Sequence, residues 1–157
     1  MIGQILCATD LSLRSGEALR VAASMATVYN VPLILLNVHE EFMDKGEMVM
    51  LRVSVEEMQE RFDRIAQESK QRMHADVRAM GVGDLEVGYM IREGKPAETI
   101  LRVGEELQEG LPVGKKILIV LGTNSKDTLK ERLLGSVAIH VVQQATCPVL
   151  AIPYTLD

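Results

Sequence analysis

The chain has 157 residues and a net charge of −5, and hydrophobic residues make up 47% of it while aromatic residues make up only 3%. This length predicts one domain, residues 1–157, with a hydrophobic core of its own. The acidic balance and the lack of tryptophan argue against nucleic acid and against a membrane surface as partners, because little positive charge or aromatic surface is present to bind them.

The two cysteines and the N-terminal segment indicate a compartment. Cys7 and Cys147 lie in or beside apolar runs and have no metal-binding spacing, so we interpret them as buried free thiols in a reducing environment. The N-terminus reaches Asp10 after a short apolar run, unlike a signal peptide, and no apolar stretch approaches the ~18 residues of a membrane span. We therefore expect a cytoplasmic protein.

The first quarter of the chain predicts a strand, a helix and a second strand. Residues 2–8 form a short apolar run, and Ser12 is a candidate cap for a helix that stops at Asn30. Residues 33–38 form a continuous apolar run, which is typical of a strand buried on both faces. The apolar positions of the helix follow helical spacing and are Leu19, Ala22, Met25, Ala26 and Tyr29.

The middle of the chain predicts a loop, a long helix and an edge strand. Residues 39–50 mix acids, a glycine and methionines without a period, and predict a loop over the carboxyl edge of the sheet. Residues 51–80 repeat apolar positions in alternating steps of three and four, with Ser69 as a polar exception, which indicates one long amphipathic helix ended by Gly81. Residues 85–91 alternate more strongly, which favours a strand near the edge of the sheet.

The last third continues the same alternation. Pro96 is well placed in the first turn of a helix that Gly110 ends. Residues 117–121 predict a buried strand, residues 136–145 a helix and residues 148–152 a last strand. Strands that alternate with helices predict an α/β fold with a parallel sheet and helices on both faces.

Ligands of such sheets bind beyond the carboxyl ends of the strands. Four predicted loops meet at that edge: residues 8–12, 38–50, 92–96 and 122–135. Small residues stand at both ends of the last loop, where backbone N–H groups can approach an anion without a side chain in the way. The sequence therefore predicts a phosphate site between Gly122 and Gly135.

Taken together, these segments resemble the universal stress proteins over essentially the whole chain. The matching segments are ATDLS at residues 8–12, NV at 37–38, GKPA at 94–97, the loop at 122–137 and CPVL at 147–150. The resemblance implies a five-stranded parallel sheet in the order 3-2-1-4-5, the Rossmann-like fold of the adenine nucleotide alpha hydrolases, and a homodimer. It also implies, for one branch of the family, ATP binding through Gly-x-x-Gly, nine residues, then Gly-Ser or Gly-Thr. This chain keeps that spacing and carries Ser125 in place of the second glycine.

The resemblance also assigns roles to individual residues. It implies that Asp10 holds the adenosine part of the nucleotide and that the backbone of Val38 meets the base. Gly122 and Gly135 would bring the backbone close to the phosphates, and Ser136 would cap the last helix and donate its hydroxyl to a phosphate oxygen. The expected ligand is ATP or AMP, with or without Mg²⁺. The predicted nucleotide-binding residues are Thr9, Asp10, Val38, Gly122, Thr123, Ser125, Gly135, Ser136 and Val137.

Several of these residues also have a purely structural explanation. Asp10 can be an acid at a helix entry, where the helix dipole stabilises it by ~0.3–1 kcal/mol. Ser136 can be an ordinary helix cap, and Val38 an ordinary buried strand residue. Ser125 leaves two outcomes open: its Cβ costs ~1 kcal/mol or more and displaces the ligand, or its hydroxyl adds a hydrogen bond to a phosphate.

Other candidate residues carry less information. His39 is the one histidine on the expected ligand edge, and the two glutamates after it are explained better by solvation of the loop than by a metal site. No Walker loop, nucleophile elbow or dinucleotide-binding fingerprint is present, so we expect no enzymatic activity beyond slow ATP hydrolysis. Cations near the phosphate loop, which a solvated face explains equally well, are Lys126, Lys130 and Arg132.

Two functions follow from these observations. The first is a cytoplasmic, homodimeric stress-response protein that binds ATP or AMP as a sensed ligand. The second is a homodimeric interaction or signalling protein of the same fold that binds no nucleotide and works through its dimer surface and residues 39–50. In both cases we predict dimerisation through residues 149–152, because an unpaired apolar edge strand is prone to association.

Overall fold

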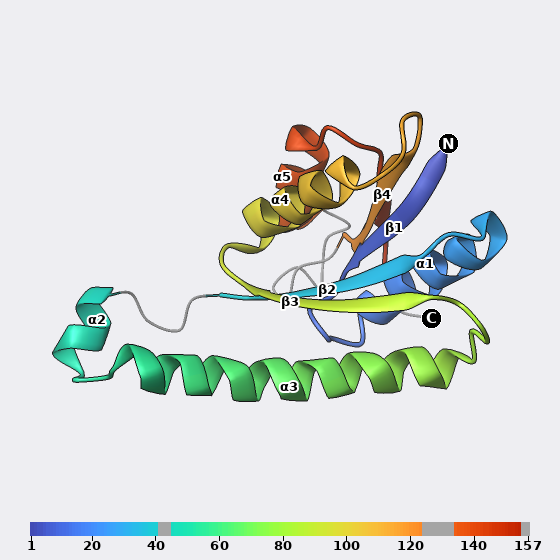
Figure 1. The fold of residues 1–157 in the computed structure, drawn as a ribbon. Helices are drawn as coiled ribbons and strands as arrows, with labels where there is room; N and C mark the ends of the chain where they lie inside the picture. Colours follow the sequence, from blue (N-terminus) through green and yellow to red (C-terminus); the bar gives the residue numbers. More distant parts are fainter. Residues whose placement is uncertain (41–44, 124–133, 155–157) are drawn as a thin grey trace.

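A five-stranded sheet organises the molecule (Figure 1). The computed structural model describes residues 1–40, 45–123 and 134–154. All strand pairs are parallel, and the strand order is β3-β2-β1-β4-β5. The predicted fold class and strand order are therefore confirmed. The strands are β1 (Ile2–Ala8), β2 (Leu33–His39), β3 (Val87–Glu93), β4 (Lys116–Gly122) and β5 (Val149–Ile152).

Helices cover both faces of this sheet. Figure 1 shows α4 and α5 together on one side, with α1 and α3 on the other. None of the helices in the described ranges is both long and apolar enough to cross a bilayer. The helices are α1 (Ser15–Tyr29), α2 (Lys45–Met50), α3 (Val55–Met80), α4 (Pro96–Glu109) and α5 (Ser136–Gln144).

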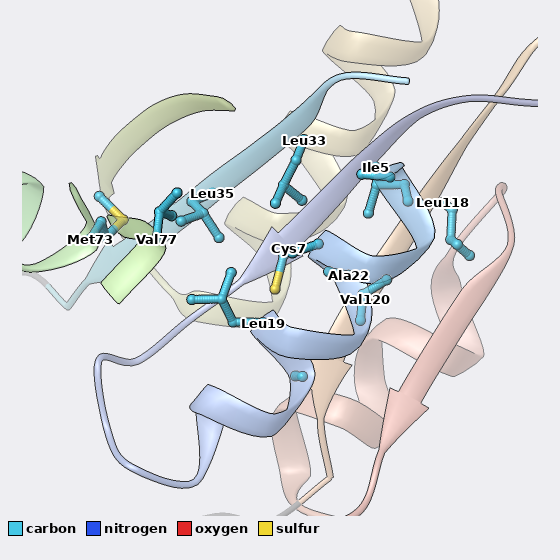
Figure 2. Packing of buried hydrophobic residues seen from close by; sticks show 13 residues of the cluster. Ile5, Cys7, Leu19, Ala22, Leu33, Leu35, Met73, Val77, Leu118 and Val120 are labelled. Carbon is cyan, nitrogen blue, oxygen red and sulfur yellow. The ribbon is translucent and has the colours of Figure 1, made fainter. Parts of the chain in front are cut away.

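The continuous apolar runs are explained by burial on two sides. In β1, Cys7 points toward α1, whereas Leu6 packs into the cluster under α4 and α5. In β2, Leu35 likewise packs into the cluster with α1, and Leu36 packs into the cluster under α4 and α5. Figure 2 shows the first cluster, in which Met73 and Val77 of α3 and several residues of α1 face the strands. Each fully buried aliphatic side chain stabilises the fold by ~1.5–3 kcal/mol, so the strand positions are strongly specified.

The first helix begins later than predicted. Its first residue is Ser15, and Arg14 occupies the N-cap position without a side-chain cap, so the prediction that Ser12 caps the helix is wrong. A tight turn takes up the residues in between: the Asp10 carboxylate accepts the Ser12 N–H (2.9 Å), and Leu11 has φ 63°. Ser12 Oγ still accepts the Ser15 N–H at 3.3 Å.

The segment after β2 also differs from the prediction. Lys45–Met50 form the short helix α2 where we predicted a loop. The long helix begins at Val55 rather than at residue 51, because Ser54 and Glu57 form a reciprocal capping box. Gly81 ends α3 in the left-handed conformation (φ 61°), as predicted.

Both cysteines are free thiols, but only one is fully buried. Burial raises the pKa of the Cys7 thiol to about 12, so this group stays protonated and inert. Cys147 is half-buried, which corrects the prediction of two buried thiols; burial raises its pKa too.

Candidate functional site

A cavity of about 740 Å³ lies beyond the carboxyl ends of β1, β2 and β4. This is the edge of the sheet where the sequence predicted a ligand site. Among the predicted site residues that the structure describes, all except Ser136 line the cavity, whereas Ser125 lies outside the described residues. The predicted residues in the lining are Thr9, Asp10, Val38, Gly122, Thr123, Gly135 and Val137.

The Thr9 side chain holds the turn after β1 together. Thr9 is buried, its Oγ1 shares a hydrogen bond with Ser15 Oγ (2.9 Å), and the same oxygen accepts the Leu11 N–H (3.1 Å). Two hydrogen bonds therefore engage this hydroxyl within the fold. Thr9 contributes to the cavity mainly by fixing the backbone that carries Asp10.

Asp10 is exposed at the cavity, and the helix-dipole explanation of this residue fails, although its carboxylate does accept the Ser12 N–H within the turn. The helix begins at Ser15, whereas dipole stabilisation falls off within the first helical turn, so Asp10 is too early in the chain to be a helix-entry acid. The following residue, Leu11, has φ 63°, a conformation that costs ~1–2 kcal/mol outside glycine. Arg72 of α3 stabilises this turn by donating from Nη2 to the Leu11 carbonyl oxygen (2.6 Å). Backbone strain of this kind collects at functional sites.

The end of β2 carries two polar residues that the fold ties to its neighbours. Asn37 Nδ2 donates to the Thr9 carbonyl oxygen (2.8 Å), just beyond the last register pair of β1 and β2. His39 Nε2 lies 2.9 Å from Ser69 Oγ on α3. Burial lowers the pKa of His39, and the nearby Glu93 carboxylate opposes part of that shift. His39 is therefore a structural link to α3 that favours the neutral imidazole.

The opposite wall is formed by the end of β4 and the start of α5. Among the described residues, a Cβ added at Gly122 would meet only the Ile152 carbonyl oxygen, at 3.9 Å, so the packing of this part of the chain does not demand a glycine there. Gly135 is the N-cap of α5 with φ −64° and ψ 159°, which any residue adopts. Both glycines line the cavity, and the backbone angles of Gly135 do not require a glycine.

The start of α5 presents backbone N–H groups. The Gly135 N–H donates to the Thr123 carbonyl oxygen and is thus engaged within the fold. The Ile139 N–H donates to the Gly135 carbonyl oxygen (3.0 Å), so the N–H groups of residues 136–138 precede the first intrahelical bond. Ser136 is exposed and follows the cap, which makes the prediction that Ser136 caps this helix wrong. Val137 and Ala138 reach the cavity.

Charge is distributed unevenly around this space. Within the described ranges, the ionised side chains that line the cavity come from the β1–α1 turn, the end of β2 and α3: Asp10, Arg14, Glu40, Glu68 and Arg72. The predicted cations of the phosphate loop lie outside the described residues. The β1, β2 and α3 wall is rich in hydrogen-bond acceptors, whereas a helix start attracts anions. The arrangement suits a ligand with an uncharged, donor-bearing end and an anionic end.

The sequence did not predict the contributions of Arg14, Asn37, Ser69 and Arg72 to this region. Ser69 could have been noticed in the sequence, since it is the one polar residue in the apolar stripe of α3. Asn37 and Arg72 act through contacts between residues 28 and 61 positions apart in the chain, which no local pattern reveals.

Comparisons with known proteins agree with this architecture. Residues 1–153 match the model of the Universal stress protein family. Universal stress protein YxiE of Bacillus subtilis is 33% identical over 97% of this chain and 99% of its own length. Universal stress protein MJ0577 of Methanocaldococcus jannaschii is 29% identical over 97% of this chain and 95% of its own length. The solved structure of MJ0577 matches all of this chain and 99% of its own, with a TM-score of 0.75 at 27% identity.

Two more distant structures share the fold. A universal stress protein in complex with cAMP is 21% identical, with a TM-score of 0.62, and the match covers 98% of each chain. A universal stress protein of Archaeoglobus fulgidus in complex with dAMP is also 21% identical, with a TM-score of 0.57, over 97% of this chain and 98% of its own.

Proposed function

Because this chain belongs to the universal stress protein family, we propose that it binds an adenine nucleotide, AMP or ATP, in the cavity beyond β1, β2 and β4. The proposal rests on one observation: the cavity lies between a wall with hydrogen-bond acceptors, from β1, β2 and α3, and a wall formed by the end of β4 and the start of α5. A volume of about 740 Å³ is within the range of ligand pockets that bury most of a small molecule. We propose that the nucleotide is a sensed ligand in a stress response in the cytoplasm.

The proposed orientation follows from the two walls. The phosphates lie at the start of α5, where the N–H groups of residues 136–138 and the helix dipole stabilise negative charge. Gly122 and Gly135 line the cavity and carry no Cβ that would stand between the phosphates and the backbone. The nucleoside lies toward β1 and β2, where the Asp10 carboxylate accepts hydrogen bonds from ribose hydroxyls and Val38 offers an apolar surface to the base.

Other members of the same fold support this choice of ligand. The cAMP and dAMP complexes are adenine nucleotide complexes of universal stress proteins. An anion without a base would make no use of the acceptors on the β1, β2 and α3 wall. We therefore favour an adenine nucleotide over a simple phosphate.

Analysis of what the purified protein carries tests the proposal. The protein is denatured in acid and the supernatant is separated by ion-exchange chromatography against AMP, ADP and ATP standards. We expect released adenine nucleotide, or, from protein stripped of ligand, saturable binding of added ATP in equilibrium dialysis with and without Mg²⁺. Protein that releases no nucleotide and binds none at millimolar concentration would instead support the interaction protein without nucleotide.

We also propose that the protein is a homodimer that pairs through β5. β5 is an edge strand of the described sheet, its four residues are half-buried, and the adjacent helix α5 exposes Ile139 (40%) and Val142 (48%). An apolar edge strand flanked by apolar helix residues favours pairing with a second copy. Sedimentation at micromolar protein is expected to give the dimer mass, and Val142→Arg to give the monomer. A monomeric parent protein would contradict this proposal.

A further inference from the structure

The turn after β1 is held at Leu11 from three directions. Leu11 has φ 63°, a conformation that residues with a Cβ rarely adopt. Its side chain packs against the cluster that contains Cys7, its N–H donates to Thr9 Oγ1 (3.1 Å), and its carbonyl oxygen accepts from Arg72 Nη2 (2.6 Å). The first two contacts come from the core and from the turn itself, whereas Arg72 belongs to α3 and lies 61 positions along the chain.

The neighbours of Arg72 on α3 fix its position. Ser69, one turn earlier, is 5% exposed and its Oγ lies 2.9 Å from His39 Nε2, and Met73 is 1% exposed. These contacts hold the backbone of α3 against the sheet. The Arg72 side chain itself is exposed and lines the cavity, so its hydrogen bond to the turn lies at the cavity surface and not in the core.

The conformation of Leu11 determines where the Asp10 carboxylate points. Leu11 stands between Asp10 and Ser12, and Asp10 Oδ1 accepts the Ser12 N–H across it (2.9 Å). A residue other than glycine keeps a positive φ only when its surroundings hold it there. A guanidinium donor holds a carbonyl oxygen more strongly than a neutral donor does. Without Arg72, Leu11 can relax toward negative φ, and the Asp10 carboxylate then turns with the backbone.

We propose that Arg72 is a positioning residue for ligand binding: by holding the Leu11 carbonyl oxygen, it fixes the Asp10 carboxylate in the orientation that accepts hydrogen bonds from ribose hydroxyls. This inference rests on the proposed nucleotide binding and deepens it. Because Arg72 acts through Asp10, its contribution to affinity cannot exceed that of Asp10. Its contribution also disappears when either the carboxylate or the ribose hydroxyls are absent.

The variant Arg72→Met tests the contribution of the guanidinium, since it keeps the length of the side chain and removes its donors. By calorimetry we expect adenosine and AMP to bind about threefold to tenfold more weakly, and no more weakly than to Asp10→Ala. The matched control is Arg64→Met, at an exposed arginine of α3 outside the cavity lining, and it is expected to keep the parent affinities. Thermal unfolding checks that each variant is folded. Parent affinities in Arg72→Met would overturn the inference.

A double variant tests whether Arg72 acts through Asp10. Added to Asp10→Ala, the change Arg72→Met is expected to cause no further loss of affinity for adenosine, because the group that it positions is already absent. A merely structural role, or an independent contact with the ligand, would make the two losses multiply, and that result would contradict the proposal.

A ligand without ribose hydroxyls gives the same test from the other side. We expect 2′,3′-dideoxyadenosine to bind the parent protein about tenfold more weakly than adenosine does, and Arg72→Met only about twofold more weakly. A loss in Arg72→Met that is larger for AMP than for adenosine would show that the guanidinium binds phosphate directly, and would overturn the positioning role alone. Failure of adenosine and AMP to bind the parent protein would overturn the proposed function and this inference with it.

Discussion

The two walls of the cavity are built in different ways. On the wall of β1, β2 and α3, side chains bond to one another and to the backbone: Thr9 to Ser15, Asn37 to the Thr9 carbonyl, and His39 to Ser69. On the wall of β4 and α5, the described lining residues are apolar or small, with Leu121, Val137 and two glycines among them. Side-chain hydrogen bonds hold the first wall, whereas backbone hydrogen bonds join the described parts of the second.

This difference indicates that the two walls bind different parts of the ligand. A wall held by side-chain hydrogen bonds keeps its acceptors in fixed positions and is suited to recognise the shape and the hydrogen-bond donors of a nucleoside. An open helix start attracts phosphate groups through backbone N–H groups and needs no side chain. Damage to the α5 wall should therefore affect phosphate-bearing ligands alone, whereas damage to the β1 wall should affect AMP and adenosine alike.

The largest effect is expected from a negative charge at the cap of α5. Gly135→Asp places a carboxylate at the N-cap, where Asp is a favourable residue and the observed backbone angles suit it. Repulsion should weaken ATP binding by about a hundredfold, while adenosine binding changes little. Calorimetric titration with both ligands measures this difference.

The control for that variant is Gly135→Asn, which has nearly the same size and caps the helix without a charge. It is expected to retain most of the ATP affinity. If Asp and Asn at this position weaken ATP equally, bulk rather than charge is responsible, and the phosphates do not lie at the start of α5.

The next effect concerns the acidic residue of the β1 wall. Asp10→Ala removes the proposed acceptor for the ribose and should weaken AMP and adenosine equally, by about tenfold. Asp84→Ala, at an exposed carboxylate beside the small cavity at the other edge of the sheet, is the matched control and should leave both affinities unchanged. A loss confined to AMP would show that Asp10 acts on the phosphate end.

A smaller effect, on the free energy of unfolding, tests the side-chain hydrogen bonds of the β1 wall. Thr9→Val keeps the shape of the side chain and removes the hydroxyl that serves both Ser15 and Leu11. The free energy of unfolding should fall by about 1–2 kcal/mol, since partners are left unpaired in a buried turn. Thr27→Val removes a hydroxyl on the exposed side of α1 and should cost less than about 0.5 kcal/mol.

Urea denaturation at fixed pH compares these two variants. Equal losses of unfolding free energy in Thr9→Val and Thr27→Val would mean that the hydrogen bonds of Thr9 stabilise the protein no more than that of Thr27 on the surface of α1.

The smallest effect is a pH dependence of stability that arises at the hydrogen bond between His39 and Ser69. Burial lowers the pKa of His39 below the ordinary value of 6.5, so the unfolded chain binds a proton at a higher pH than the native chain does. Stability should therefore fall as the pH drops from about 6.5 toward the lowered native pKa. His39→Gln should flatten this part of the profile, and a variant with the same slope as the parent would exclude His39 as its source.

Much of the fold was predictable because its strongest signal is local. Runs such as residues 33–38 lack alternation since both faces are buried, and that pattern identified the strands and the parallel sheet. Helix starts were less accurate where side chains bond to the backbone. The capping box of Ser54 and Glu57 is readable from their spacing and would have placed the start of α3 correctly.

The site was predictable only where chain topology determines it. Asp10, Val38 and Gly122 reach the cavity because they lie at or next to strand ends, which meet at one edge of any parallel sheet. The hydrogen bond from Asn37 Nδ2 to the Thr9 carbonyl oxygen was not predictable, since it joins residues 28 positions apart. Sequence pattern thus located the cavity, and tertiary contacts decide how each polar group in it is used.

Nucleotide binding across the two walls is tested most directly by a calorimetric titration of ligand-free protein with ATP, with adenosine and with inorganic phosphate. Two unlike walls around one cavity predict saturable binding of ATP that is much tighter than the binding of either part alone. No heat of binding from ATP up to millimolar concentration, or phosphate that binds as tightly as ATP, would contradict nucleotide binding in this cavity.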